Sequence, residues 1–231
     1  AGADPNVVSC GKTPLVAAAC EDETKIIKCL LKSGANPNVA DNCGVTPLEH
    51  GAMRGNLATV MILFPFTSQI SSFPDWSFSG IMKHINSAKA RKQRDDKMME
   101  VFQMSKSKGA DAFKRKDYLD AIYWYSEASF ADPCDATSYS NRSLCWTLLK
   151  QGIQALFDAE MCVKMKPTWA KAHYREGAAW MLLENYSMAA EAFSKALKLD
   201  PDNNEIRKAH WEAVEAEFGI SVSENLKVLH I

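Results

Sequence analysis

The sequence predicts an all-α protein built of two helical repeat arrays. The first observation is a period in the second half of the chain, where Pro133, Pro167 and Pro201 are evenly spaced (167 − 133 = 34 and 201 − 167 = 34). The second is a period upstream, where Thr13-Pro14-Leu15 recurs as Thr46-Pro47-Leu48 (46 − 13 = 33). Fixed periods of this length are typical of stacked helix hairpins, in which no repeat buries its apolar face alone. Because such arrays usually present a wall that binds peptides, the periods favour a binding protein.

The 34-residue period defines three repeats followed by one more helix. The repeats are Phe102–Asp135, Ala136–Trp169 and Ala170–Asn203. Each closes with a proline, which ends the second helix because proline has no amide hydrogen to donate to an interior turn. Small residues keep the same step and should let the paired helices approach closely: Ala121, Ala155, Ala189 and Ala128, Cys162, Ala196. The stretch Asn204–Phe218 predicts a capping helix, and the tail beyond Gly219 is expected to extend that helix or fray.

These repeats resemble tetratricopeptide repeats. In that family a small residue stands early in the first helix, alanine and an aromatic residue stand in the second, and a proline closes the repeat. Gly109, Ser143 and Gly177 occupy the first of these positions, and Tyr125 and Phe193 occupy the aromatic one. The resemblance covers residues 101–203, and it implies a solenoid domain that residues 204–231 close as a capping helix and tail.

The upstream period resembles ankyrin repeats over residues 1–66. Gly2–Asn6 recurs as Gly34–Asn38, and each Thr-Pro pair predicts a helix start, where proline loses no hydrogen bond. Val16 and Glu49 stand where the family usually has histidine, which leaves its turn-bracing hydrogen bonds at that slot without their usual donor. Residues 1–8 match the end of a repeat, so we expect further ankyrin repeats before residue 1.

Residues 67–100 predict a linker and a connecting helix. The apolar stretch Phe73–Ser77 is similar to the linker of plant ankyrin–tetratricopeptide proteins, and we expect Trp76 and Phe78 to be largely buried against an array end. From Ile81 to Lys108 the chain predicts one continuous helix. Its densely charged middle, Lys89–Lys97, is interpreted as a solvated surface. The alternative is a nuclear-import patch or a nucleic-acid contact through the basic residues Lys89, Arg91, Lys92 and Arg94.

Composition narrows the functional classes. The net charge of −1 provides no overall basic field for nucleic acid. No apolar run approaches the length that spans a membrane, so no membrane partner is expected. The seven cysteines are scattered and odd in number, which fits a reducing compartment better than a disulfide framework. We therefore expect a cytoplasmic protein, with the nucleus as a further location.

Catalytic and metal-binding patterns are weak. The five histidines have no partners at metal-ligand or catalytic spacing, and no Ser-His-Asp or Cys-His arrangement can be argued from the sequence. Cys10-Gly11-Lys12-Thr13 resembles the end of a phosphate-binding loop, but Asn6 stands where the first glycine must be, and a Thr-Pro helix start explains the stretch better. We predict that the protein is not an enzyme and uses no cofactor or metal.

Four residues resemble the dicarboxylate clamp of co-chaperone tetratricopeptide domains. They are Lys106, Asn141, Lys171 and Arg175, at the repeat positions where that family holds the C-terminal Glu-Glu-Val-Asp tail of cytosolic heat-shock chaperones. The resemblance implies that cations and an amide converge on the two terminal carboxylates in a partly desolvated groove.

One clamp position differs from the family. The family has asparagine where this chain has Ala110, which removes a donor to the terminal carboxylate. A hydrogen bond to a charged group contributes roughly 1.5–3 kcal/mol, so the loss should weaken tail binding by about ten-fold or more. Phe113, Leu144 and Thr147 are expected to line the adjacent pocket for the valine of the tail, and the alternative for them is ordinary packing between repeats.

The sequence as a whole predicts a co-chaperone adaptor. The tetratricopeptide groove would bind a chaperone tail, and the ankyrin repeats would bind another protein, so that one chain tethers both. One alternative is a scaffold whose groove binds an unrelated protein, with Ala110 marking a lost chaperone function. The other is a nuclear or nucleic-acid adaptor that uses Lys89–Lys97.

Overall fold

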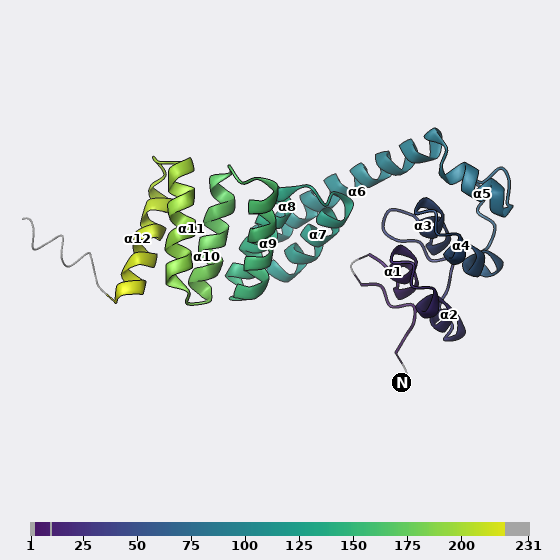
Figure 1. The fold of residues 1–231 in the computed structure, drawn as a ribbon, viewed down its shortest axis with the longest axis horizontal. Helices are drawn as coiled ribbons and strands as arrows, with labels where there is room; N and C mark the ends of the chain where they lie inside the picture. Colours follow the sequence, from purple (N-terminus) through teal and green to yellow (C-terminus); the bar gives the residue numbers. More distant parts are fainter. Residues whose placement is uncertain (1–2, 10, 220–231) are drawn as a thin grey trace, which may run out of the picture. The chain divides into compact units, whose positions relative to one another are not determined.

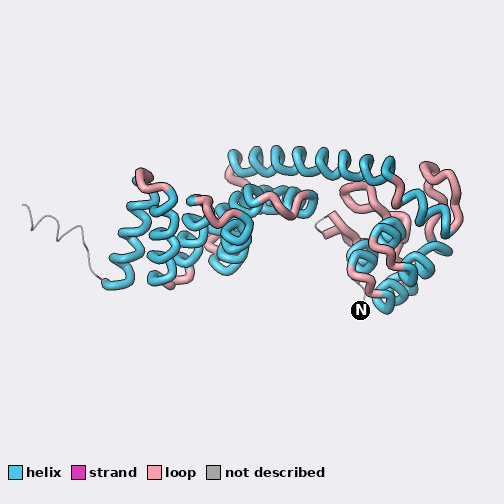
Figure 2. Tube along the Cα trace, turned by 45° about the horizontal axis from the view of Figure 1, so that its top comes forward, coloured by secondary structure: helices cyan, strands magenta, loops and turns pink. Residues whose placement is uncertain are grey.

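The computed structural model describes residues 3–9 and 11–219 and divides the chain into two compact units, Ala1–Gln103 and Met104–Ile231. Helices are the only extended regular elements of the described residues, and a single bridge between Ser9 and Lys12 is the one strand-like pairing there (Figure 2). The predicted all-α class is therefore confirmed. None of the described helices combines the length and the apolar character needed to cross a membrane.

The first unit contains two short helix hairpins. Their helices are α1 (Pro14–Cys20) with α2 (Thr24–Lys32) and α3 (Pro47–Met53) with α4 (Leu57–Leu63), followed by the 3-10 turn η1 (Phe64–Phe66). Thr13 and Thr46 cap α1 and α3, and a proline takes the first helical position in each. The hairpins pack through a core of fully buried side chains, among them Leu15, Ile27, Leu48, Val60 and Leu63.

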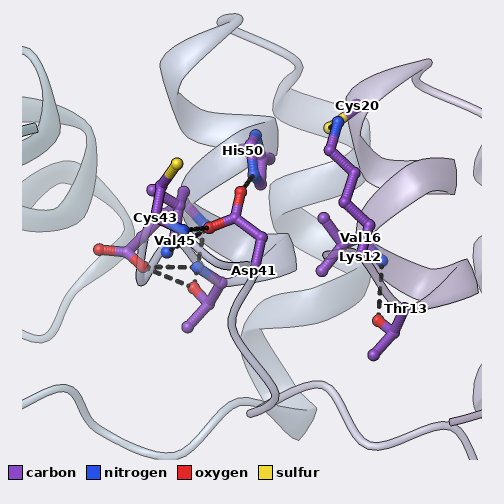
Figure 3. A network of polar contacts seen from close by, with 10 residues as sticks. Lys12, Thr13, Val16, Cys20, Asp41, Cys43, Val45 and His50 are labelled. Carbon is purple, nitrogen blue, oxygen red and sulfur yellow. Dashed lines mark hydrogen bonds and ion pairs between the residues drawn. The ribbon is translucent and has the colours of Figure 1, made fainter. Parts of the chain in front are cut away.

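An aspartate braces the turn that leads into α3. The carboxylate of Asp41 accepts hydrogen bonds from the backbone amides of Cys43 and Val45, both at 2.9 Å, and lies 2.8 Å from Nε2 of His50 (Figure 3). Glu49 completes a reciprocal capping box with Thr46. The turn is therefore braced even though Glu49 fills the slot where the family has histidine, because His50 one residue later reaches the turn from α3.

The same cluster holds a buried thiol. The ammonium group of Lys12 lies 3.6 Å from the sulfur of Cys20 (Figure 3). Burial acts to lower the pKa of His50, but hydrogen bonds and charge interactions with Asp41 and Cys20 outweigh it and raise that pKa to about 9. Burial acts to raise the pKa of Cys20, but His50 and Lys12 outweigh it and lower that pKa. The cluster joins α1 to α3 through charge as well as through packing.

The segment after the second hairpin packs on the same unit. Phe73 is buried, and its ring meets Trp76 edge-on with the centroids 5.6 Å apart. Trp76 and Phe78 are half-buried and pack against the core of the first unit, so they are less covered than the sequence predicts.

The single helix predicted over Ile81–Lys108 is wrong. The structure has two helices, α5 (Phe78–Ile85) and α6 (Ala88–Lys114). The break follows from local hydrogen bonds, because the side chain of Asn86 donates to the carbonyl of Met82 and the hydroxyl of Ser87 accepts from the amide of Ala90. Asparagine and serine side chains of this kind compete with the helical backbone pattern and cap helix ends.

The second unit begins within α6 and continues as stacked hairpins. It contains α7 (Tyr118–Ala131), α8 (Ala136–Leu148), α9 (Gly152–Met165), α10 (Ala170–Leu182), α11 (Tyr186–Leu199) and α12 (Asn204–Phe218), which Figure 1 shows in sequential order. Pro133, Pro167 and Pro201 each lie two residues after a second helix ends, as predicted. The capping helix has the predicted bounds and ends at Gly219, whose φ of +61° is left-handed. The tail beyond Gly219 lies outside the described residues.

The 34-residue period extends to the backbone of the turns. Lys116, Lys150 and Glu184 have left-handed φ angles of 63°, 59° and 58° at the same step (150 − 116 = 34 and 184 − 150 = 34). In each turn the amide of the left-handed residue and the amide after it donate back to the last carbonyls of the first helix, which satisfies groups that a helix end leaves unpaired. The predicted small residues are fully buried: Ala121, Ala128, Ala155, Cys162, Ala189 and Ala196.

Two glycines allow the closest helix contacts. A Cβ atom at Gly177 would lie 2.6 Å from a ring carbon of Phe193, and one at Gly109 would lie 2.8 Å from a ring carbon of Tyr125. Both aromatic side chains are buried in the second helix of the same repeat. Glycine is therefore required in these first helices by the ring that packs on it.

We expect Gly177→Ala to destabilise the second unit by about 1–3 kcal/mol, because the new methyl group overlaps the ring of Phe193. At an open helical site the same change would stabilise by up to about 1 kcal/mol. Urea denaturation of the full chain measures the effect, and Phe193→Leu in the same background should recover part of the loss. A rise in stability on Gly177→Ala alone would contradict the packing argument.

A second prediction concerns the pH dependence of the first unit, measured in a Cys20→Ser background so that Cys20 does not titrate. The pKa of His50 is raised in the folded state, so its contribution to stability is complete below the ordinary value of 6.5. It is then lost as the pH rises through the folded-state pKa, which Asp41 still raises but which lies below about 9 in this background, because Cys20 contributes to that value. We expect a loss of about 1–3 kcal/mol, read from hydrogen exchange of the α3 amides against Cys20→Ser/His50→Gln at each pH. Identical pH profiles for the two proteins would show that His50 carries no such linkage.

Candidate anion-binding site

Two cations of the predicted clamp line one pocket of the second unit. Lys171 and Arg175 are four residues apart on α10 and so share a helical face. They open onto a hollow of about 330 Å³ between the start of α10 and the region where α11 passes into α12. Its other lining residues are Trp169, Ala170, Tyr174, Asp200, Asn203, Glu205 and Ile206.

Arg175 is a largely desolvated cation with unused hydrogen-bonding capacity. Its Nε atom is buried and has no hydrogen-bond partner in the part of the chain that the structure describes. The guanidinium carbon lies 5.8 Å from the ring centre of Tyr174. Burial lowers the pKa of Arg175, opposed by interactions with Tyr174, Cys162 and, more weakly, Glu205. A guanidinium at such a site is completed most favourably by an acceptor that carries negative charge.

Another arginine of the same array, Arg142, has hydrogen-bond acceptors for its guanidinium group within the fold. Arg142 on α8 donates to both carboxylate oxygens of Asp158 on α9, at 2.8 and 2.6 Å, and to the hydroxyl of Ser126 on α7 at 2.8 Å. This arginine binds three helices together and has its acceptors within the fold. The contrast indicates that Arg142 is structural and that Arg175 is available to a ligand.

Lys171 adds a second positive charge beside Arg175. Lys171 is exposed as a whole residue, yet partial desolvation lowers the pKa of its ammonium group. The charge of Arg175 lowers that pKa further. The ammonium lies 5.9 Å from the centre of the Trp169 ring. Two neighbouring cations repel each other, so an anion placed between them would relieve that repulsion and form charge-assisted hydrogen bonds with both.

Lys106 already has an acidic neighbour within the unit. Its ammonium lies 3.1 Å from the carboxylate of Asp135, which caps α8 and accepts from both the amide and the hydroxyl of Ser138. Burial acts to raise the pKa of Asp135, but the bonds from Ser138 and Lys106 outweigh it and lower that pKa. A ligand carboxylate at Lys106 would therefore share or replace this ion pair.

Asn141 lies on α8, half-buried, and its side chain acts on the pKa of Tyr125. Burial raises the pKa of Tyr125 to about 12, and Asn141 opposes the rise. The tyrosine therefore stays a neutral phenol beside the amide of Asn141.

The predicted lining residues have mixed environments. Ala110 is partly exposed, four residues after Lys106 on α6. Phe113 packs on Tyr118 with the ring centroids 5.7 Å apart, within the core of the first repeat, so much of its ring serves packing. Leu144 is half-buried, and Thr147 donates its hydroxyl proton to the carbonyl of Ser143 at 2.8 Å.

The pKa of the buried Cys162 thiol responds to charged residues near both parts of the predicted clamp. Burial and the charge of Asp158 raise the pKa of this α9 thiol to about 12, Arg175 opposes the rise, and Asp135 adds a smaller contribution. Asp135, which pairs with Lys106, and Arg175 therefore both act on one buried thiol. The structure brings Lys171 and Arg175 together; that Lys106 and Asn141 face the same ligand stays a prediction.

The sequence interpretation missed several residues of this site. Asp135 could have been found, because an aspartate just before a predicted helix is a capping signal and its charge lies close to the helix start. The pocket walls formed by Trp169 and Ile206 depend on how α12 packs after α10, and neither periodicity nor charge pattern reports that packing.

The geometry defines a class of protein: a helical repeat solenoid with an unsatisfied cationic pocket. Comparison with known families identifies two types of repeat in the chain. Residues 1–72 match the family of ankyrin repeats in three copies, and residues 170–203 match the tetratricopeptide repeat. The chain thus contains ankyrin repeats in residues 1–72 and a tetratricopeptide repeat in residues 170–203.

Relatives of known name match part of the chain. The Hsp70-Hsp90 organizing protein 2 of Arabidopsis thaliana is 40% identical over 101 residues, which are 44% of this chain and 18% of that protein. The Hsp70-Hsp90 organizing protein 1 of Glycine max is 34% identical over 154 residues, which are 63% of this chain and 27% of that protein. The chain therefore spans less than a third of the length of these relatives.

A solved structure shares the architecture of half the chain. The first tetratricopeptide domain of human RPAP3 is 28% identical and superimposes with a TM-score of 0.50, covering 52% of this chain and 94% of that domain. The described helices, the family matches and this similarity agree on ankyrin and tetratricopeptide repeat domains.

Proposed function

We propose that the tetratricopeptide unit binds the acidic C-terminal tail of a cytosolic heat-shock chaperone. The observation that carries the proposal is Arg175, a largely buried guanidinium whose Nε lacks an acceptor among the described residues and which lies beside Lys171. A C-terminal aspartate offers two carboxylates a few ångströms apart, which suits two cations on one helical face. The kinship to Hsp70-Hsp90 organizing proteins supports a chaperone as the source of that tail.

Each cation would contribute differently. Arg175 would supply directional hydrogen bonds in a desolvated setting, where they are strongest. Lys171 would add charge from the mouth of the pocket. Lys106 would hold the other carboxylate only by loosening its 3.1 Å contact with Asp135, so part of its binding energy offsets the lost internal pair. Asn141 would donate an amide hydrogen from its half-buried position on α8.

The ankyrin unit would bind a second protein, so that the chain tethers a chaperone to that protein. Linking two binding modules raises the effective concentration of one partner near the other without any new contact. A cytoplasmic location follows from the proposed chaperone partner. A scaffold whose groove binds an unrelated acidic C-terminus is the alternative, and it requires the same cations but another tail sequence.

The basic stretch of α6 has local contacts. Arg94 donates to the carbonyl of Ile85 at 2.9 Å, and Lys97 pairs with Glu100 at 2.9 Å. These contacts engage part of the charge on which the nucleic-acid alternative depends, and that alternative stays without a supporting observation.

A peptide ending in Met-Glu-Glu-Val-Asp should bind the full chain with a dissociation constant of roughly 1–100 μM, the range of a few charge-assisted contacts. Amidation of its C-terminus should abolish binding, because it removes one of the two carboxylates. Isothermal titration measures both. Arg175→Ala should lower affinity more than ten-fold, whereas Lys195→Ala, a paired lysine on α11, should leave it unchanged. Equal binding of the free and amidated peptides would contradict the proposal.

Ala110→Asn should tighten tail binding by about 0.5–1.5 kcal/mol, or three- to ten-fold, because it restores an amide donor four residues from Lys106. The gain should disappear in an Arg175→Ala background, where the carboxylate is no longer held in position. If Ala110→Asn has no effect while Arg175→Ala removes binding, the tail lies in another register. If neither variant matters, the groove serves a different partner.

A further inference from the structure

Large apolar side chains are exposed at repeating positions on the second helices of the tetratricopeptide unit. Leu119 and Tyr123 on α7 are 68% and 41% exposed, and Ile153 and Phe157 on α9 are 74% and 61% exposed. The second pair lies one repeat after the first (153 − 119 = 34 and 157 − 123 = 34), so both pairs have the same place in the hairpin. We call these four residues the outer stripe.

The outer stripe points away from the packed side of its helices. Ala121 and Tyr125 on α7, and Ala155 and Ala159 on α9, are buried against the neighbouring helices. A shift of two residues turns a helix by about 200°, so Tyr123 and Phe157 project from the opposite side. The carboxylate site is formed by first helices and α12, so the outer stripe is a separate surface of the unit.

The third repeat shows that the fold does not need apolar residues there. The corresponding positions on α11 are Ser187 and Glu191, and Glu191 pairs with Lys195 at 2.8 Å as on an ordinary solvated helix. The same hairpin architecture therefore forms with polar residues at these positions. Leu119, Ile153 and Phe157 are each more than 60% exposed and so gain little from folding, whereas Tyr123 also packs edge-on against Trp124 with the ring centroids 5.0 Å apart.

We propose that the outer stripe binds an amphipathic helix of a partner protein, with apolar residues on one side and acidic residues along one edge. Each pair of stripe residues is spaced i, i+4 and so forms one apolar ridge on its own helix, against which the apolar side of a partner helix can pack. Lys116 and Lys150 stand three residues before Leu119 and Ile153 in the left-handed turns, exposed and with no ion pair in the described part of the chain. These two lysines select an acidic edge on the bound helix.

The size of the outer stripe favours one partner helix over a second copy of the chain. Its four side chains expose on the order of 400 Å² of mostly apolar surface. A standard stable interface buries about 800 Å² on each partner, so this stripe alone is too small for a lasting dimer. A transient complex with a single amphipathic helix needs no more than a few apolar anchors.

The test uses variants that exchange residues between repeats of the full chain. Ile153→Ser/Phe157→Glu gives repeat two the residues of repeat three, which the fold already accepts at these positions. Ser187→Ile/Glu191→Phe does the reverse and extends the outer stripe by one repeat. The probe is a fluorescein-labelled 18-residue peptide of leucine, alanine and glutamate, with leucines on one helical side and glutamates along one edge. Binding is read by fluorescence anisotropy.

We expect the Ile153→Ser/Phe157→Glu protein to bind this probe at least five-fold more weakly than the wild type. The Ser187→Ile/Glu191→Phe protein should bind it at least two-fold more tightly. A probe with lysine in place of glutamate should bind poorly to all three. The acidic-tail peptide should bind the wild type and the repeat-two variant alike, and their thermal midpoints should agree, so failure here is distinct from failure of the tail-binding proposal.

Three results would overturn the inference. One is equal probe binding by the wild type and the repeat-two variant. Another is concentration-dependent self-association in sedimentation that disappears in the repeat-two variant, which would make a second copy the occupant. The third is binding of the wild type, but not of the variant, to vesicles of phosphatidylserine and phosphatidylcholine without binding to the helical probe, which would assign the surface to lipid.

Discussion

The fold depends on how closely two helices of one repeat approach each other. Gly177 lies against the ring of Phe193 and Gly109 against the ring of Tyr125, at distances that leave no room for a methyl group. Alanines and Cys162 fill the other contact positions without exposure. Because each hairpin buries its apolar face only against its neighbours, this close approach is repeated at a fixed period. The left-handed turns and the closing prolines recur at the same 34-residue step as these contacts.

The same requirement explains why much of the fold could be predicted and why particular features could not. The repeat period and the helix propensities of individual residues were enough to predict the closing prolines, the buried alanines and the bounds of α12. The break between α5 and α6 depends on two side chains, Asn86 and Ser87, that cap helices without the proline or glycine on which the prediction relied. The brace at Asp41 depends on His50 reaching back one residue later than the family pattern has it.

The sequence predicted which cations belong to the candidate site, but it did not predict which of them are already paired within the fold. Repeat position identified Lys171 and Arg175, because residues four apart share one face of a first helix. It did not report that Lys106 is already paired with Asp135, nor that the acceptor of Arg142 is Asp158 within the fold. Whether a cation is available to a ligand depends on its acid neighbours in space. Those neighbours come from other helices, and a period along one chain does not encode them.

A solenoid has two sides, and the residues of this chain use them differently. On the first helix of repeat three, Lys171 and Arg175 are kept partly desolvated, and Nε of Arg175 has no acceptor among the described residues, which favours a small, strongly charged ligand. On the second helices of repeats one and two, large apolar residues remain exposed where the third repeat has Ser187 and Glu191. Neither feature strengthens the fold, since a buried unpaired charge and an exposed apolar side chain both cost stability or solubility. Their presence in an otherwise regular array indicates that the helices form a scaffold. Binding is then determined by residues that the fold itself does not require.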